Sequence, residues 1–185
     1  MNKEQLVAQA VNIAKKFIRP GEGLELRAYP DAASPLSKTL SNMGKLVLYK
    51  LGKFELTKDL LKLDAEPVSI GYGQTGGIKL GTVWTLEQAE EALSKQVTTR
   101  ALDVLKSAPN LLKHSPEKLA ACISLQYNIG SEAFRTSTVA KMIAQEDMPA
   151  AAQAFKRFNI AKGVVNQGLI NRRQAEVDLF LSVKG

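Results

Sequence analysis

Two glycine-rich segments of the sequence constrain the fold more than any other feature. The first occupies residues 21–31 (GEGLELRAYPD) and the second residues 69–77 (SIGYGQTGG). Apolar and polar side chains alternate in the first segment, which predicts a short strand over about 24–29. The glycines on either side of Glu22 allow the backbone to turn tightly there. We therefore expect the strand to carry Asp31 at its far end, across a cleft from Glu22.

The second segment predicts another short strand, over about 68–73. Its glycines mark places where backbone or a ligand comes close, and it opens with a hydroxyl residue, Ser69. The two segments are separated by 37 residues, 32–68.

Glu22, Asp31 and Ser69 are candidates for the cleavage of a glycosidic bond. That reaction needs one carboxyl group to protonate the leaving oxygen, and a second group to stabilise the oxocarbenium-like centre or to activate water. Glu22 and Asp31 fit these two roles, and the Ser69 hydroxyl is able to hold the attacking water. Acidic residues beside a turn are more often simply solvated, so the residues by themselves leave both interpretations open.

The pattern Glu-Gly-x-x-Leu-x-Ala-Tyr-x-Asp, followed by Gly-Tyr-Gly-x-Thr-Gly-Gly, resembles the active-site signature of the phage-type lysozymes. These are endolysins that cut the glycan of the bacterial cell wall. The resemblance implies that Glu22, Asp31 and Ser69 are the catalytic residues. The sequence departs from the family pattern in two substitutions and one insertion. Ser69 replaces the usual Thr, Gln74 replaces a usual His, and the segment 32–68 is inserted. Thr39 or Thr57, inside the insertion, are alternative sources of the hydroxyl.

Residues 168–176 resemble a second family signature, Gly-Leu-x-x-Arg-Arg-x-x-Glu. In the family an arginine of this signature lies near the catalytic Glu, which implies that Arg172 supports Glu22, with Arg173 as the rival. The alternative is that both arginines are solvated and paired with Glu176 and Asp178 at helical spacing.

The resemblance also implies a set of substrate-binding residues. An aromatic-Asn-x-Gly turn faces the substrate cleft in the family, and a small hydroxyl residue that touches substrate begins the next helix. The corresponding residues are Tyr127, Asn128 and Ser137, to which we add Tyr72 of the glycine-rich turn.

The N-terminal half of the chain predicts one long helix, followed by the two short strands with the insertion between them. Apolar residues recur at helical spacing over 3–19, and Pro20-Gly21 is a stop signal that places Glu22 just beyond the helix. Within the insertion we expect a loop over 32–41, a strand over 45–51 and a short helical turn capped by Thr57. The insertion holds six lysines. It is interpreted as a structural elaboration of a small sheet or as a lid or wall-binding arm.

The C-terminal half predicts a helical lobe. Thr85 and Gln88 form a capping box that opens a long helix, and Ser115-Pro116 starts another. This second helix, from Lys118 to about Tyr127, is apolar nearly all round and is expected to be the buried centre of the lobe. Further helices are expected from Ser137, over 149–157 and over 169–182.

These elements and the resemblance together predict a mainly helical, α+β, lysozyme-like fold. A small β-sheet lobe with an inserted segment is joined by a long helix to a helical lobe. We expect residues 1–185 to form one lysozyme domain, with a small β-rich lobe at 22–80 and the insertion at 32–68. The connecting helix is expected at 85–105, and the helical lobe, 106–185, is expected to pack with the N-terminal helix.

The composition limits the possible partners. A formal charge of +7 and a pI near 9.5 favour a polyanion such as nucleic acid, an acidic membrane surface or an anionic cell wall. Aromatic residues are few and no basic run reaches five residues, so nucleic acid binding would explain only the charge. A single cysteine, Cys122, and a single histidine, His114, argue against a disulfide, a metal site and a Ser-His-Asp triad. No cofactor is expected.

No signal peptide and no transmembrane span is predicted, because the N-terminal helix is amphipathic. With the resemblance, this implies a protein that stays in the host cytoplasm until a separate pore-forming protein releases it to the wall. We expect a monomer.

The function that the resemblance implies is hydrolysis of the β-1,4 bond between N-acetylmuramic acid and N-acetylglucosamine in bacterial peptidoglycan. An inverting course is expected if the two carboxyl groups leave room for water. A lytic transglycosylase, which would use Glu22 alone, is one alternative. A cell-wall-binding module without catalysis is the other.

Overall fold

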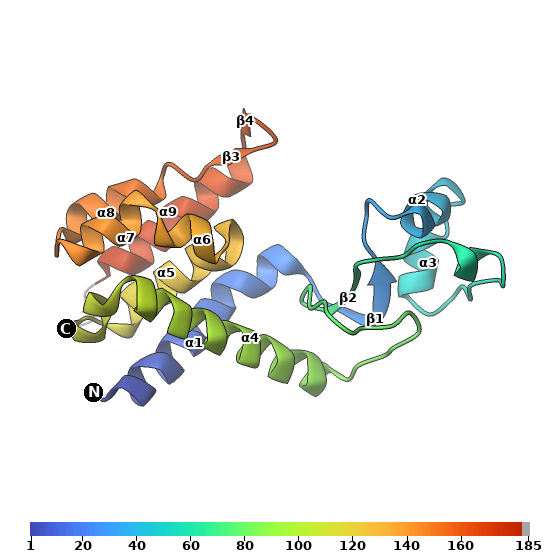
Figure 1. The fold of residues 1–185 in the computed structure, drawn as a ribbon, viewed down its shortest axis with the longest axis horizontal. Helices are drawn as coiled ribbons and strands as arrows, with labels where there is room; N and C mark the ends of the chain where they lie inside the picture. The colour runs from blue at the N-terminus through green and yellow to red at the C-terminus, as the bar shows by residue number, and fades with distance from the viewer. Residues whose placement is uncertain (183–185) are drawn as a thin grey trace. The chain divides into compact units, whose positions relative to one another are not determined.

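The computed structural model describes residues 1–182, which divide into two compact units (Figure 1). The helical unit comprises residues 1–18 together with the chain from Ser94 onward, and the small unit comprises Arg19–Leu93. Two helices, α1 (Lys3–Glu22) and α4 (Leu86–Ser107), are continuous through the boundaries between the units. The observed division resembles the expected pair of lobes, although the end of α1 and the start of α4 belong to the small unit.

Helix α1 does not end at Pro20, as the sequence predicted, but continues to Glu22. A proline removes one backbone donor from a helix, and here the helix runs on for two more residues. The residue that ends it is Gly23, which takes the left-handed conformation (φ 71°) and donates its N–H to the carbonyl of Arg19 at 3.2 Å. Glu22 is therefore the last helical residue and not a loop residue.

The small unit contains the two expected strands, β1 (Glu25–Pro30) and β2 (Val68–Gly71). They pair antiparallel, with Tyr29 opposite Ser69 and Glu25 opposite Gly71, and the register shifts between these two pairs. The residues after β2 turn back, because Ile70 and Gln74 exchange backbone hydrogen bonds of 2.9 Å. The second strand is thus shorter than the expected 68–73.

The insertion is helical, which corrects the expected loop and strand. It contains α2 (Pro35–Asn42), α3 (Leu46–Lys50) and a single 3₁₀ turn, η1 (Leu60–Lys62). Ser34 caps α2 by accepting the N–H of Ser37 at 3.1 Å, and Pro35 occupies the first turn. The predicted helical turn after Thr57 is confirmed, because the Thr57 hydroxyl accepts the N–H of Leu60 at 3.4 Å.

The insertion also supplies much of the core of the small unit. Its buried side chains pack against residues from both strands, and all are at most 8% exposed. The cluster consists of Ala28, Leu36, Leu40, Tyr49, Leu60, Ala65, Val68 and Ile70. A two-stranded sheet has too little apolar surface to be stable alone, so the insertion is a structural part of this unit.

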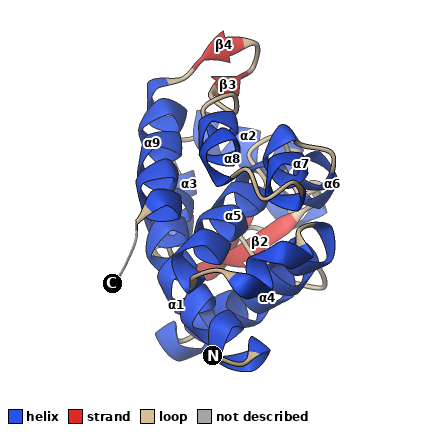
Figure 2. Cartoon of the chain, turned by 90° about the vertical axis from the view of Figure 1, so that its left-hand side faces the viewer, coloured by secondary structure: helices blue, strands red, loops and turns tan. Residues whose placement is uncertain are grey.

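The helical unit follows α4 with η2 (Pro109–Lys113), α5 (Pro116–Ile129), α6 (Ser131–Arg135), α7 (Thr138–Ala144), α8 (Met148–Phe155) and α9 (Gln167–Leu181) (Figure 2). Every residue from Leu119 to Gln126 of α5 is buried, which confirms this helix as the centre of the unit. Helix α9 packs against both α5 and α8. A short hairpin, β3 (Ile160–Ala161) and β4 (Val164–Val165), precedes α9 where no element was predicted.

The predicted capping box and the starts of α7 and α8 are confirmed, whereas Ser115, at the start of α5, makes no capping hydrogen bond with its side chain. The Thr85 hydroxyl accepts the N–H of Gln88 at 3.2 Å, and the Gln88 side chain accepts the N–H of Thr85 at 2.8 Å, which completes the capping box. The side chains of Ser137 and Asp147 cap α7 and α8, each by accepting one backbone N–H from the first turn of its helix. Between residues 1 and 182, no helix has the length and apolar character needed to cross a bilayer.

Candidate active site in the small unit

The end of α1 places Glu22 beside the glycine-rich turn that follows β2. A Cβ atom added at Gly73 would lie 3.7 Å from Oε2 of Glu22, and Gly73 itself has a φ of 83°. The Glu22 residue is exposed. The structure therefore brings together the two glycine-rich segments, 51 positions apart at these residues (73 minus 22).

Gln74 fixes the shape of this turn. Its side-chain carbonyl accepts the N–H of Tyr72 at 2.7 Å, and the residue is only 8% exposed. A Cβ atom at Gly71 would lie 2.4 Å from this oxygen and 3.0 Å from the ring of Trp84, so only glycine fits there. The departure from the usual His thus places a hydrogen-bond acceptor inside the turn.

A second network ties the turn to both long helices. The hydroxyl of Tyr72 donates to Oε1 of Glu90, near the start of α4, at 2.7 Å. The other oxygen of Glu90 accepts a hydrogen bond from Arg19, which precedes Glu22 by three residues in α1. The hydrogen bond to Glu90, and secondarily burial, raises the pKa of Tyr72. Arg19 and Glu90 were not singled out in the sequence, although their opposite charges near helix ends were visible.

Tyr72 is buried, and the contact with Glu90 gives it a structural role. Its assignment as a substrate-binding residue stays a prediction.

Asp31 and Ser69 lie together at the other end of the two-stranded sheet. Asp31 directly follows β1, and its N–H donates to the carbonyl of Pro67 at 2.9 Å. Its Oδ1 accepts the N–H of Ala33 at 2.8 Å, which forms a local turn. Ser69 lies opposite Tyr29 in the register, while Glu22 precedes the end where Glu25 pairs with Gly71. Both Asp31 and Ser69 are half-buried.

The alternative hydroxyl residues have other environments. Thr39 is part of α2, and the Thr57 hydroxyl caps η1. Of the three candidates, only Ser69 belongs to the sheet that carries the glycine-rich turn.

Arg172 and Arg173 belong to a buried cluster in the helical unit. Glu176 is fully buried and accepts hydrogen bonds from the hydroxyl of Ser124 at 2.6 Å, from Arg173 at 3.0 Å and from Arg172 at 3.3 Å. Burial raises the pKa of Glu176 and lowers the pKa of Arg173, while their mutual attraction opposes both shifts.

This cluster revises the alternative in which both arginines are solvated. Arg173 is 1% exposed, so for this residue the alternative is wrong. Asp178 accepts a hydrogen bond from Gln174 at 2.7 Å. The helical pairing with Glu176 is present for both arginines. The role of Arg172 beside Glu22 stays a prediction.

The other predicted substrate-binding residues lie in the helical unit. The Tyr127 hydroxyl donates to Gln96 at 3.0 Å, and Arg100 lies 5.7 Å from the centre of its ring. Asn128 is exposed, whereas Ser137 is buried as a helix cap. Substrate contact by these residues stays a prediction.

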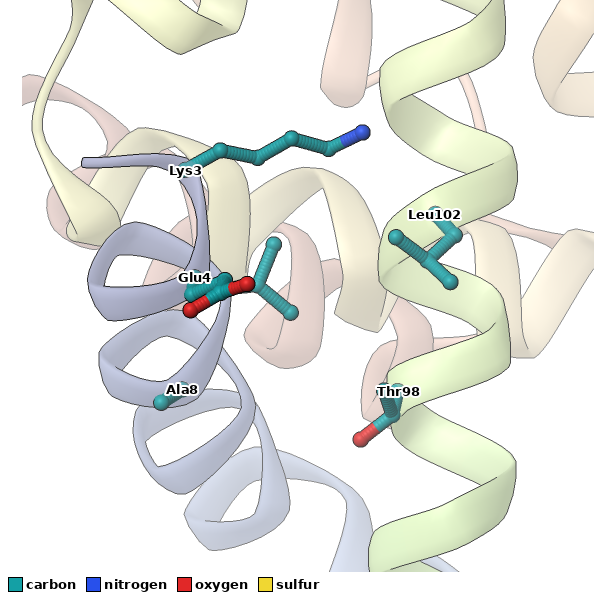
Figure 3. Close-up of a pocket in the computed structure, with 6 residues that line it drawn as sticks. Lys3, Glu4, Ala8, Thr98 and Leu102 are labelled. Carbon is teal, nitrogen blue, oxygen red and sulfur yellow. The ribbon is translucent and has the colours of Figure 1, made fainter.

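A groove and a buried thiol of the helical unit lie outside the set of predicted site residues. A groove of about 450 Å³ between α1 and α4 in the helical unit contains none of the predicted site residues (Figure 3). It is lined by Lys3, Glu4, Val7, Ala8, Thr98 and Leu102. Burial strongly raises the pKa of the Cys122 thiol, as expected for an inert core cysteine. In residues 1–182, no group of three or more His, Cys, Asp or Glu side chains is arranged to hold a metal ion.

Comparison with known proteins gives a consistent family match. Residues 52–176 match the family model described as phage lysozyme. This span includes Ser69, Gln74 and both arginines of the C-terminal signature, and it begins after Glu22 and Asp31.

Two curated endolysins are similar in sequence. The endolysin of Acyrthosiphon pisum secondary endosymbiont phage 1 is 36% identical over 120 residues, which are 62% of this chain and 80% of that protein. The endolysin of Bacillus phage PZA is 30% identical over 179 residues, 96% of this chain. The chain spans about half (55%) of that relative's length.

Solved structures show the same fold. The endolysin from Escherichia coli O157:H7 phage FAHEc1 superposes with a TM-score of 0.64 at 27% identity, covering 94% of this chain and 91% of that one. The active form of the P1 phage endolysin Lyz gives a TM-score of 0.66 at 17% identity, a likeness of fold alone, over 91% of this chain and 83% of that one. The expected lysozyme-like α+β fold is confirmed.

Proposed function

Since this chain belongs to the phage lysozyme family, we propose that it is an endolysin that hydrolyses the β-1,4 bond between N-acetylmuramic acid and N-acetylglucosamine in bacterial peptidoglycan. The proposal rests above all on one observation, the position of the Glu22 carboxylate beside the glycine-rich turn, where a Cβ atom added at Gly73 would lie 3.7 Å from its Oε2. Because Gly73 has no side chain, the turn leaves room for a sugar ring to approach this carboxyl group.

Glu22 is the general acid in this proposal. In the free protein the residue is exposed, and a bound glycan removes water from around it. Loss of water favours the neutral carboxyl group, which is the form that protonates the leaving oxygen. The networks around Gln74 and Glu90 hold the turn and the end of α1 in place, so the acid is positioned before substrate arrives.

Asp31 and Ser69 have the supporting roles. Asp31 supplies a carboxylate that either stabilises the positive charge that develops on the sugar or acts as base, while the Ser69 hydroxyl positions the attacking water. Water attack on the face opposite to the acid gives inversion. Arg172 is the family-implied support of Glu22, Tyr127, Asn128 and Ser137 are the family-implied substrate contacts, and Tyr72 is our addition to them.

The positive charge of +7 is proposed to attract the enzyme to the anionic wall, after a separate pore-forming protein has released it from the host cytoplasm. Because ions screen such attraction, binding to isolated walls is expected to weaken between 50 and 500 mM salt (about a tenfold range). Binding that does not change with salt would refute the electrostatic part of the proposal.

The decisive experiment is a digest of purified peptidoglycan, with the new ends identified by mass spectrometry. The wild type is compared with Glu22→Gln and with Glu91→Gln, an exposed glutamate of α4 in the same unit. Reducing muramic ends that disappear only with Glu22→Gln are the expected result. Anhydro-muramic ends would identify a lytic transglycosylase, and wall binding without cleavage would identify a binding module.

A second comparison tests the hydroxyl. Ser69→Ala is expected to lower the rate less than Glu22→Gln does, because water can still enter the site without the hydroxyl. Ser41→Ala, on the exposed end of α2, is the control. If Ser69→Ala cleaves at the wild-type rate, the water-positioning role belongs elsewhere, and Thr39→Ala and Thr57→Ala are the next variants.

A further inference from the structure

Three large apolar side chains of the insertion, at the end of α2 and along α3, are exposed and do not belong to the core of the small unit. Met43, Val47 and Leu51 are 48%, 66% and 61% exposed. Val47 and Leu51 lie one helical turn apart, since the N–H of Leu51 donates to the carbonyl of Val47 at 3.0 Å. On the same short helix Tyr49 is 1% exposed and belongs to the core. Helix α3 therefore buries one side in the unit and presents a second apolar side to the surroundings.

The segment that carries these exposed apolar residues has charged residues of one sign only. Residues 32–54 contain four lysines and no aspartate or glutamate. Lys50 is paired with Glu25 at 2.9 Å, and Lys45 lies 5.8 Å from the centre of the Phe54 ring. Lys38 and Lys53 are exposed. Lysines thus alternate along the segment with the exposed apolar residues.

We propose that the docking hairpin, residues 35–53, binds the surface of a bilayer that contains anionic phospholipid. Interfacial binding combines burial of apolar side chains at the boundary of headgroups and acyl chains with attraction between lysines and acidic headgroups. The hairpin provides both components on one short segment. Such docking lies at the membrane surface and requires no spanning helix.

The exposed apolar residues favour lipid over the other polyanions. An anionic polysaccharide or a nucleic acid attracts lysines but gives Met43, Val47 and Leu51 no apolar environment. Next to Leu51, a groove of about 370 Å³ adds the apolar side chains of Leu24, Leu26 and Val83, and its lining also includes Glu25, Arg27 and Lys50. This larger apolar surface within the small unit suits a partner that is itself apolar below a charged layer.

The test measures co-sedimentation of the full chain with vesicles. One set of vesicles is phosphatidylcholine alone, and the other contains phosphatidylglycerol as about a third of the lipid. The wild type is expected to bind only the second set, and more weakly as salt is raised. Absence of binding to the phosphatidylglycerol vesicles would overturn the proposal.

Two double variants separate the apolar and the charged contributions. Val47→Ser with Leu51→Ser removes two exposed apolar side chains and is expected to lower the vesicle affinity by about tenfold or more. Lys45→Gln with Lys53→Gln is expected to lower it several-fold and to reduce its salt dependence. The matched controls are Val164→Ser with Val165→Ser, equally exposed residues of the β3–β4 hairpin (66% and 65%), and Lys141→Gln with Lys156→Gln, exposed lysines of the helical unit.

The outcomes are distinct from those of the catalytic proposal. All four double variants alter exposed or half-buried side chains outside the proposed catalytic residues, so each is expected to cleave soluble glycan fragments at the wild-type rate and to keep its melting temperature. Equal vesicle binding by the Val47/Leu51 variant and the wild type would refute lipid docking. Lipid docking would also be refuted if the lysine variant lost binding only to isolated wall polymer and not to vesicles. That result would assign the lysines to wall binding.

Discussion

A Cβ atom at Gly73 would lie 3.7 Å from Oε2 of Glu22. This distance is an ordinary van der Waals contact, so a methyl group there fits but fills the space beside the carboxylate. Gly73 therefore has two roles: it adopts a φ of 83° that other residues adopt with strain, and it leaves room next to the proposed acid.

Gly73→Ala is expected to lower the rate of peptidoglycan cleavage by tenfold or more (roughly 1.4 kcal/mol of barrier). The matched variant is Gly76→Ala, because Gly76 has a φ of 88° and no atom within 4 Å of an added Cβ. Both variants pay a similar backbone penalty, about 1–2 kcal/mol. Denaturant unfolding is expected to give similar losses of stability, while only Gly73→Ala loses activity. Equal activities for the two variants would contradict the proposed role of the space.

Gln74 supports the turn through the N–H of Tyr72, at 2.7 Å. Gln74→Ala removes the acceptor of this buried donor, which is expected to cost about 1–3 kcal/mol of folding free energy. Gln153→Ala, at an exposed position of α8, is the control and is expected to change the stability by less than about 0.5 kcal/mol. Urea unfolding of the two variants makes the comparison. A Gln74→Ala protein as stable as the wild type would show that another group accepts the hydrogen bond.

The hydrogen bond from Tyr72 to Glu90 predicts a pH dependence of stability. The pKa of Tyr72 is raised above its ordinary value of 10.0, so the folded protein holds this proton more tightly than the unfolded chain does. The stabilisation is fully present below pH 10 and is lost as the pH rises above 10 through the folded-state pKa. Tyr72→Phe cannot titrate, and its free energy of unfolding is expected to fall less than that of the wild type between pH 9 and 11. If the free energy of unfolding changed equally with pH in the two proteins, Tyr72 would not be the source of this pH dependence.

Local sequence patterns predicted the capped helices and the two strands because each signal lies within a few residues. The capping box at Thr85 and Gln88 and the alternation over β1 are examples. The insertion was predicted incorrectly for the opposite reason. Residues 45–51 were assigned to a strand from their apolar character, but the burial of Tyr49 against β1 and β2 selects a short helix. That contact depends on residues distant in the sequence.

The candidate site, like the fold, was predicted only in part from the sequence. The resemblance singled out Glu22 and the glycine-rich turn, and in the structure a Cβ atom added at Gly73 would lie 3.7 Å from Oε2 of Glu22, while the catalytic roles of Glu22, Asp31 and Ser69 stay predictions. The Arg19–Glu90–Tyr72 network and the burial of Arg173 were not predicted, because charged residues on helices are usually solvated and no local pattern marks the exceptions. An indirect signal for the buried cluster was Ser124, a polar residue inside the apolar and buried helix α5.

The buried pair of Arg173 and Glu176 predicts a large effect of single substitutions. In Arg173→Met, the fully buried Glu176 loses its main cation, which costs about 3–5 kcal/mol. Adding Glu176→Gln removes the remaining charge and keeps a side chain able to accept the hydrogen bond from Ser124, so the double variant is expected to recover most of that loss. Arg157→Met, an exposed arginine of the same unit, serves as control.

The same single variant also has an expected pH signature. Burial raises the pKa of Glu176 above its ordinary value of 4.5, so the folded state takes up this proton more readily than the unfolded chain. In the variant, it is the charged form of the buried Glu176 that destabilises the folded state. The stability deficit of Arg173→Met relative to the wild type is therefore expected to shrink as the pH falls from 7 toward 5. Thermal unfolding of the wild type, the single variant and the double variant at both pH values measures this. A deficit that is constant with pH, and is not relieved by Glu176→Gln, would mean that Arg173 stabilises the unit through packing and not through its charge.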